Sequence, residues 1–202
     1  MKKMVIASNN AGKLREFAQL LAPFDFEAIP QPVFNIPEAA EPYTTFIENA
    51  LEKARHASRL TGLPALADDS GICAVAISGA PGVCSARYAA ADANEAKNDT
   101  RNNEKLVRTL SSYADKRAFY YCSLVLVMHA GDPHPLIADG QWWGEIIATP
   151  RGDGGFGYDP HFFIPEYSCT AAELDTTVKN RVSHRGQAMA LLALKLSQQK
   201  AV

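Results

Sequence analysis

Two adjacent carboxylates and a hydroxyl follow an apolar run in "ALADDSGI", residues 65–72. Mg²⁺ prefers oxygen ligands and is usually bound through one or two carboxylates together with substrate phosphates, a role that Asp68 and Asp69 would suit. Because neighbouring side chains on an extended chain point to opposite faces, both reach one ion only if the backbone turns, which Ser70 and Gly71 permit. The stretch indicates either a metal site or an Asx turn that ends a strand, and an isolated sequence of this kind is more often the turn.

A second candidate is the polar loop "SNNAGK", residues 8–13, which follows a short apolar strand. Gly12 and Lys13 stand where an amphipathic helix is expected to begin. Backbone N–H groups, the helix dipole and a cation would then converge on one point, as in a triphosphate site. The spacing of glycine and lysine excludes a Walker A motif, and an ordinary loop explains the stretch equally well.

Three polar residues, Asn49, Lys53 and His56, share one face of an expected helix at spacings of four and three. A solvated stripe is the simplest interpretation. Lys53 would otherwise direct a positive charge toward the first loop. Separately, Glu38 and Glu41, from the preceding proline-rich segment, could complete the metal set of Asp68 and Asp69.

The sequence "GDGGFG", residues 152–157, matches the dinucleotide pattern GxGxxG. That pattern requires a helix to open on the glycines, and the prolines that follow exclude one. What remains is a glycine loop that displays Phe156, Tyr158 and Asp159, which would supply aromatic faces for a flat ring and an acceptor for its N–H groups. Aromatic side chains tucked into the core are the alternative for one of the two.

The stretch "SHRGQA" places Ser183 as an expected helix cap, with His184 and Arg185 in the first turn. Cations there oppose the helix dipole at about 0.3–1 kcal/mol each, so a negative or accepting group is expected beside them. Lys179 adds to the same positive cluster. A chance surface cluster is the alternative.

The elements that must position these residues alternate irregularly between strand and helix, which predicts an α/β fold with a mixed sheet. One helix is capped by Thr44 or Thr45 and ended by Gly62. No repeat or linker divides residues 1–202, so we expect one domain. The other expected elements are strands at 3–8, 64–67, 72–77 and 118–130, helices at 13–23, 94–113 and 184–200, and a hairpin at 135–150.

Composition narrows the functional classes. Apolar residues make up 47% of the 202 residues and charged residues 21%, and the net charge of −2 argues against a general nucleic-acid binder. The four cysteines form no CxxC pair, so we expect reduced thiols. Because no apolar run has the length of a signal peptide core or a membrane span, we expect a cytoplasmic protein with no membrane partner.

Taken together, the motifs resemble the inosine triphosphate pyrophosphatase family, which hydrolyses noncanonical purine nucleoside triphosphates. The resemblance runs nearly end to end, through "SNNAGK", "TFIENALEKA", "ALADDSGI", "GAPGVCSARY", "GGFGYDPHFF", "TAAEL" and "SHRGQA", in the family's order. It departs from the family pattern at Ala40, where an acidic pair with Glu41 is common, and at Thr177 and Val178.

The resemblance implies a long central mixed sheet flanked by helices, with two lobes and a cleft between them, in a homodimer. It implies Mg²⁺-dependent hydrolysis of ITP, dITP or XTP to the nucleoside monophosphate and pyrophosphate. A pyrophosphatase for modified pyrimidine or methylated nucleotides in a related fold is the alternative. A nucleotide-binding regulator without catalysis, or a structural protein, are the alternatives of a different class.

The resemblance also assigns roles to residues. Asp69 would be the general base and, with Asp68 and Glu41, a metal ligand. The residues that would bind substrate are Ser8, Asn9, Asn10, Ala11, Gly12, Lys13, Lys53, Ser70, Arg87, Phe156, Gly157, Tyr158, Asp159, Lys179, His184 and Arg185.

Overall fold

The computed structural model describes residues 2–9, 11–92 and 95–200 of the chain. The chain divides into two compact units. Unit 1 comprises Met1–Asp69, Cys122–Gly140 and Gln187–Val202, and unit 2 comprises Ser70–Tyr121 and Gln141–Gly186. That residues 1–202 form one domain with a cleft between two lobes stays a prediction.

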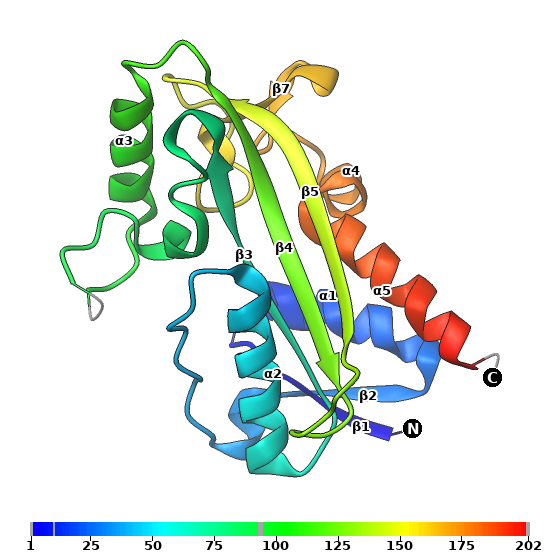
Figure 1. Cartoon of the computed structure of the whole chain (residues 1–202). Helices are drawn as coiled ribbons and strands as arrows, with labels where there is room; N and C mark the ends of the chain where they lie inside the picture. Colours follow the sequence, from blue (N-terminus) through cyan, green and yellow to red (C-terminus); the bar gives the residue numbers. More distant parts are fainter. Residues whose placement is uncertain (1, 10, 93–94, 201–202) are drawn as a thin grey trace. The chain divides into compact units, whose positions relative to one another are not determined.

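A seven-stranded sheet has the strand order β2-β1-β3-β4-β5-β6-β7. β1 pairs in parallel with both β2 and β3, whereas β6 is antiparallel to β5 and β7, which confirms the expected mixed sheet. The longest strands, β3, β4 and β5, are labelled in Figure 1. The strands are β1 (Lys2–Ile6), β2 (Phe26–Pro30), β3 (Ala65–Ala74), β4 (Arg117–Val127), β5 (Leu136–Ile146), β6 (Phe162–Ile164) and β7 (Cys169–Thr170).

The helices begin and end where local chemistry requires. Thr45 caps α2 by accepting a hydrogen bond from the Glu48 N–H, and Gly62 ends that helix with a φ of 69°, which favours glycine. Asn98 caps α3 in the same way. The helices are α1 (Ala11–Leu21), α2 (Phe46–Thr61), α3 (Asp99–Leu110), α4 (Thr176–Val182) and α5 (His184–Lys200). None of the described helices combines the length and apolar character needed to cross a bilayer.

The core of unit 1 places α1 and α2 beside the strands that carry the candidate site. Phe17 and Leu21 of α1 are fully buried in a cluster that includes Leu66 of β3. Ala50 and Ala54 of α2 belong to a second cluster with strand residues, and their small side chains let the helix approach the sheet closely. The polar face of α2 is therefore held near β3.

The core of unit 2 fixes α3. Leu106 and Leu110 of α3 are buried in one cluster with Ile72, Trp142 and Phe162. Burying side chains of this size contributes about 1.5–3 kcal/mol each. The apolar face of α3 is thus fixed in the core, and its polar side chains can contact other segments of unit 2.

The structure corrects the prediction that the chain turns at Ser70 and Gly71. β3 is one continuous strand through Asp68 and Asp69, where the sequence predicted two strands with an interruption. Its residues are buried almost throughout, so the backbone groups are satisfied in the sheet and the two carboxylates are buried with it. The compensation for that burial comes from other elements, which the local sequence does not reveal.

One other prediction was wrong, and one strand was not predicted. Residues 135–150 form no hairpin, because the alternation of buried and exposed residues in β5 continues through Asp139 and Gly140, which resemble a turn in the sequence. The edge strand β2 was not predicted, because its residues are only partly buried and lie next to the proline-rich segment. The helix expected at 94–113 is the shorter α3, and residue 94 lies outside the described residues.

Gly144 of β5 offers a test of this packing. A Cβ at this position would lie 2.5 Å from the Phe163 carbonyl oxygen and 2.7 Å from the Phe162 ring, so Gly144→Ala should lower the free energy of unfolding by about 1–3 kcal/mol. Urea unfolding measures the change. Gly131→Ala is the control, since a Cβ there meets only the His129 ring at 3.8 Å. Equal stability of the two variants would contradict the close packing of β5 against β6.

Candidate functional site

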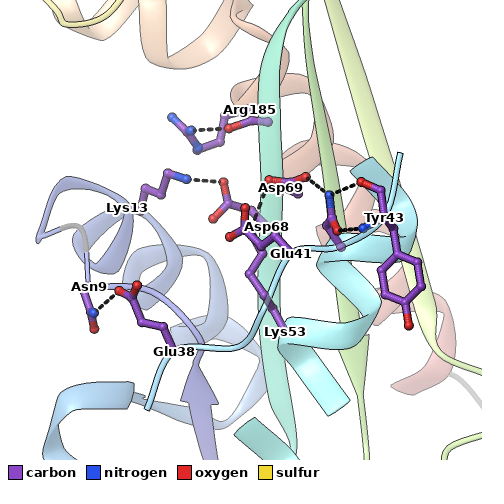
Figure 2. Close-up of polar contacts among 11 residues, drawn as sticks. Asn9, Lys13, Glu38, Glu41, Tyr43, Lys53, Asp68, Asp69 and Arg185 are labelled. Carbon is purple, nitrogen blue, oxygen red and sulfur yellow. Dashed lines mark hydrogen bonds and ion pairs between the residues drawn. The ribbon is translucent and has the colours of Figure 1, made fainter. Parts of the chain in front are cut away.

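Acidic and basic side chains meet at the end of unit 1 where β3 leaves it, and we call them the acid–base cluster (Figure 2). Lys13 Nζ lies 2.6 Å from Asp68 Oδ2. Lys53 Nζ lies 3.2 Å from Asp69 Oδ1 and 3.0 Å from Glu41 Oε1. The adjacent aspartates are thus paired with lysines of two different helices. The members of the cluster are Lys13, Glu41, Lys53, Asp68 and Asp69.

Burial makes these ion pairs consequential. Asp68 is 3% exposed and Asp69 is 7% exposed. A carboxylate at such a depth is strongly disfavoured without a partner, and removing one member of a buried pair typically costs about 3–5 kcal/mol. The lysines therefore permit two ionised carboxylates to lie side by side in a strand.

The pKa values within the cluster reflect the competition between burial and charge. Burial raises the pKa of Asp69 above its ordinary value, with Lys53 opposing the rise and Glu41 adding to it. Burial acts to lower the pKa of Lys53, but the carboxylates of Asp69, Asp68 and Glu41 outweigh it and raise that pKa. Lys53 is consequently held as a cation, and Asp69 is a better proton acceptor than an exposed aspartate.

Asn49 is a member of the site that the sequence interpretation missed. The solvated stripe proposed for its helix face is wrong here, because Asn49 is 1% exposed. Its Nδ2 donates to Asp69 Oδ2 at 3.3 Å and to the Tyr43 carbonyl at 3.1 Å, and its Oδ1 accepts from the Tyr43 N–H at 3.0 Å. The spacing of four residues from Lys53 is the signal that could have indicated it.

The first loop and the proline-rich segment line a cavity of about 250 Å³ in unit 1. It adjoins the start of α1, whose dipole places partial positive charge there. Asn9 donates a hydrogen bond to Glu38 across this region. Asn10 lies outside the described residues, and Ala11 and Gly12 form the first turn of α1. The lining residues are Ala7, Ser8, Asn9, Lys13, Gln31, Glu38, Ala39, Glu41, Lys53 and Asp68.

The donor chemistry of the cluster fits a hard divalent cation. Asp68, Asp69 and Glu41 offer carboxylate oxygens, the ligands that Mg²⁺ prefers. In the described part of the chain, no three His, Cys, Asp or Glu residues are grouped closely enough to hold a metal by themselves. The arrangement suits an ion that takes one or two carboxylates and completes its shell with water and phosphate oxygens.

Unit 2 contains the second group of candidate residues. They are centred on the segment 152–158, and we call this segment the glycine loop. Phe156 is 55% exposed, whereas Tyr158 is buried and its hydroxyl donates to the Ser85 carbonyl at 2.8 Å. Only the Phe156 ring of this pair is therefore presented at the surface. Tyr158 is the aromatic residue that belongs to the core.

The buried Asp159 carboxylate binds the backbone of the glycine loop. Its Oδ2 accepts from the Phe156 N–H at 2.7 Å and from Lys179 Nζ at 2.6 Å, and its Oδ1 accepts from the Tyr120 hydroxyl at 3.2 Å. Burial raises the pKa of that hydroxyl far above its ordinary value, with the Asp159 carboxylate adding to the effect, so Tyr120 remains a donor. The Asp159 carboxylate, which was expected to accept hydrogen bonds from a nucleobase, thus accepts them from groups of the protein. Tyr120 was not among the predicted site residues.

The remaining basic residues predicted for the site, His184, Arg185 and Arg87, lie at the start of α5 and in η4 (Gly82–Arg87). The His184 ring stacks on Tyr120 at 4.8 Å between centroids, and Arg185 Nη2 donates to Ser70 Oγ at 3.4 Å (Figure 2). The Ser70 hydroxyl is an accepting group of the kind expected beside Arg185. Ser183 Oγ accepts from the Gly186 N–H, as a cap does. Arg87 ends η4 and is exposed.

Comparison with known proteins decides the family. The sequence profile of the Ham1 family matches residues 4–195. The chain belongs to the Ham1 family. Among curated Ham1-like relatives, the dITP/XTP pyrophosphatase of Ralstonia nicotianae is 61% identical over 196 residues, which is 97% of each chain. The dITP/XTP pyrophosphatase of Chromobacterium violaceum is 61% identical over 194 residues, or 96% of each chain.

Solved Ham1 structures share the fold. The HAM1 protein of Coxiella burnetii has a TM-score of 0.92 and 46% identity, covering 98% of this chain and 100% of its own. The Ham1 protein of Staphylococcus aureus has a TM-score of 0.89 and 36% identity over the same shares. These similarities confirm the resemblance stated from the motifs.

The buried amide of Asn49 generates a prediction. Asn49→Leu leaves the Tyr43 backbone groups and one Asp69 oxygen without this partner, so the free energy of unfolding should fall by at least about 2 kcal/mol. Chemical denaturation measures it. The exposed Arg59 of the same helix serves as control, and Arg59→Gln should change stability by less than about 0.5 kcal/mol. A wild-type midpoint for Asn49→Leu would refute the bracing role of the amide.

Proposed function

We infer that this Ham1 protein is a nucleoside triphosphate pyrophosphatase that hydrolyses the noncanonical purine nucleotides ITP, dITP and XTP to the monophosphate and pyrophosphate. The relatives named dITP/XTP pyrophosphatase support the substrate class. The observation that carries the inference is the acid–base cluster, in which Lys13 and Lys53 pair with Asp68 and Asp69 beside a cavity.

At the phosphate end, water would attack the α-phosphorus while the bond from that phosphorus to the bridging oxygen breaks. Asp69 would accept the proton of the water, a role that its raised pKa favours. The charge that develops on the departing pyrophosphate would be stabilised by Lys13 and Lys53. The first loop, Ser8 to Lys13, would hold the triphosphate through N–H groups at the start of α1.

We propose Mg²⁺ as the cofactor, held by one or two of the carboxylates of Asp68, Asp69 and Glu41 together with phosphate oxygens and water. When bound with the nucleotide, the ion would neutralise phosphate charge and polarise the phosphoryl oxygens. Lys53, which contacts both Asp69 and Glu41, would hold the two carboxylates near each other. Asn49 would orient Asp69 through its amide.

At the base end, the exposed Phe156 ring would stack on the purine. A 6-oxo group accepts hydrogen bonds, so a donor such as Arg185 or a backbone N–H would favour hypoxanthine and xanthine. Adenine would leave such a donor unpaired, at a cost of about 1–3 kcal/mol. Lys179 and His184 would border the same base, and Ser70 would contact the substrate beside Asp69.

We further propose that the protein is a cytoplasmic homodimer that binds neither nucleic acid nor membrane. The net charge of −2 supports the absence of a general nucleic-acid surface. The four cysteines are free thiols, consistent with a reducing compartment.

The function is tested by pyrophosphate release from ITP, dITP, XTP, dGTP, dATP and dTTP, each with and without Mg²⁺. We expect rapid, Mg²⁺-dependent turnover of the first three nucleotides. Preferred turnover of dTTP would instead establish the pyrimidine nucleotide pyrophosphatase. Binding of ITP without turnover would establish the regulator.

Asp69→Asn tests the base. The amide cannot accept the proton, so kcat should fall by roughly 100-fold or more. We expect the fold to be retained, because the amide has nearly the same shape, its one oxygen can still accept from Asn49 or from Lys53, and Lys53 keeps its contact with Glu41. Steady-state kinetics and far-UV circular dichroism measure the two effects. Asp139→Asn, an exposed aspartate of β5, is the control. A normal kcat in Asp69→Asn would remove Asp69 from the mechanism.

A further inference from the structure

α3 contacts the glycine loop at Gly157. The Gly157 N–H donates to Asp99 Oδ2 at 2.9 Å, and the Gly157 carbonyl accepts from Asn103 Nδ2 at 2.8 Å. Asp99 and Asn103 are four residues apart and therefore lie on one face of the helix. Two side chains from one helix thus engage both backbone polar groups of one loop residue.

The residue held in this way controls the direction of its neighbour. Gly157 has a φ of 63°, in the left-handed region that glycine adopts most readily, and Phe156 precedes it directly. The Phe156 N–H is bound to Asp159, and the Tyr158 hydroxyl is bound to the Ser85 carbonyl. The backbone is fastened on either side of Phe156, and its ring is left exposed.

Asp99 also forms an ion pair with a lysine near the Phe156 ring. Its Oδ1 lies 3.2 Å from Lys97 Nζ, and this ammonium lies 5.5 Å from the centroid of the Phe156 ring. One carboxylate therefore fixes both the loop backbone and a cation beside the aromatic face.

Burying the polar side chain of Asn103 lowers the stability of the fold. It is 8% exposed, and within the described part of the chain its Oδ1 has no hydrogen-bond partner. A buried polar atom of this kind disfavours folding, and an apolar residue would avoid the penalty. In return, Nδ2 donates to the Gly157 carbonyl at 2.8 Å and to the Asp99 carbonyl of the same helix at 2.9 Å, and the first of these contacts reaches the glycine loop.

We propose that Asp99 and Asn103 are positioning residues for base recognition, acting through Gly157 to hold the Phe156 ring ready for a purine. This inference rests on the proposed function and extends it to a helix that contributed none of the predicted site residues. A loop ordered before binding costs less free energy to engage than one that must be ordered by the ligand. The pair should therefore affect binding of the base and leave the phosphate chemistry intact.

Asn103→Leu is the first test. It keeps the volume and removes the donor, so KM for dITP should rise roughly tenfold, the scale of a lost base–aromatic stack, while kcat changes less than about twofold. Asn98→Ala is the matched control, because it removes the N-cap of the same helix without touching Gly157. It should lower the urea midpoint and leave KM unchanged.

Product inhibition separates the two ends of the substrate. Inosine monophosphate carries the base, and inorganic pyrophosphate does not. In Asn103→Leu, the inhibition constant of inosine monophosphate should rise roughly tenfold, and that of pyrophosphate should stay within a factor of about two. General damage to the fold would raise both constants together.

Asp99 supplies a rescue experiment that does not depend on the Asn103 variant folding. Asp99→Ala removes the acceptor for the Gly157 N–H and should raise KM, whereas Asp99→Asn retains an acceptor oxygen and should restore most of the wild-type KM. Equal KM values in wild type, Asp99→Ala and Asn103→Leu would overturn the positioning role, as would a KM increase in Asn98→Ala equal to that in Asn103→Leu.

Failure of the proposed function is recognised separately. If the wild type hydrolyses none of the purine nucleotides, calorimetric titration with inosine monophosphate replaces KM as the readout for the same variants. Weaker binding in Asn103→Leu than in Asn98→Ala would then support the positioning role without the activity. No binding by the wild type would overturn both proposals.

Discussion

The burial of two adjacent carboxylates in the middle of a strand is the constraint on which the site depends. Asp68 and Asp69 lie in β3, where each is almost fully buried, and neither could remain ionised there alone. Their partners, Lys13 and Lys53, come from α1 and α2. Because the pairs link both helices to β3, the charges that would act on a triphosphate also belong to the packing of unit 1.

The glycine loop differs from β3 because it exposes an apolar aromatic ring, and its backbone must be held in one conformation to do so. Hydrogen bonds to Asp159 and to α3 hold its backbone, the Tyr158 hydroxyl is bound to the Ser85 carbonyl, and the Phe156 side chain is left at the surface. Both groups of residues therefore rely on polar contacts made inside the protein. The order they impose reduces the entropy that a ligand would have to supply.

The motifs in the sequence predicted the family, the mixed sheet and the ends of α2 and α5, because capping residues and periodicity act over a few residues. The sequence did not predict that β3 continues through Asp68 and Asp69. The lysines that stabilise these buried carboxylates are 55 and 16 positions away in the sequence. Asn49 was missed for the same reason. An asparagine on a polar helix face is solvated unless the fold covers it, and the Tyr43 segment and β3 cover this one.

By itself, the sequence determined which residue types stand at the strand end, in the glycine loop and at the start of the last helix, and hence the chemistry open to them. Only the tertiary structure decided which lysine pairs with which aspartate, that Tyr158 is buried while Phe156 is exposed, and that α3 holds Gly157. The physical reason is that burial and ion pairing depend on distances in space between residues far apart along the chain, and local patterns of charge and hydrophobicity carry no record of those distances.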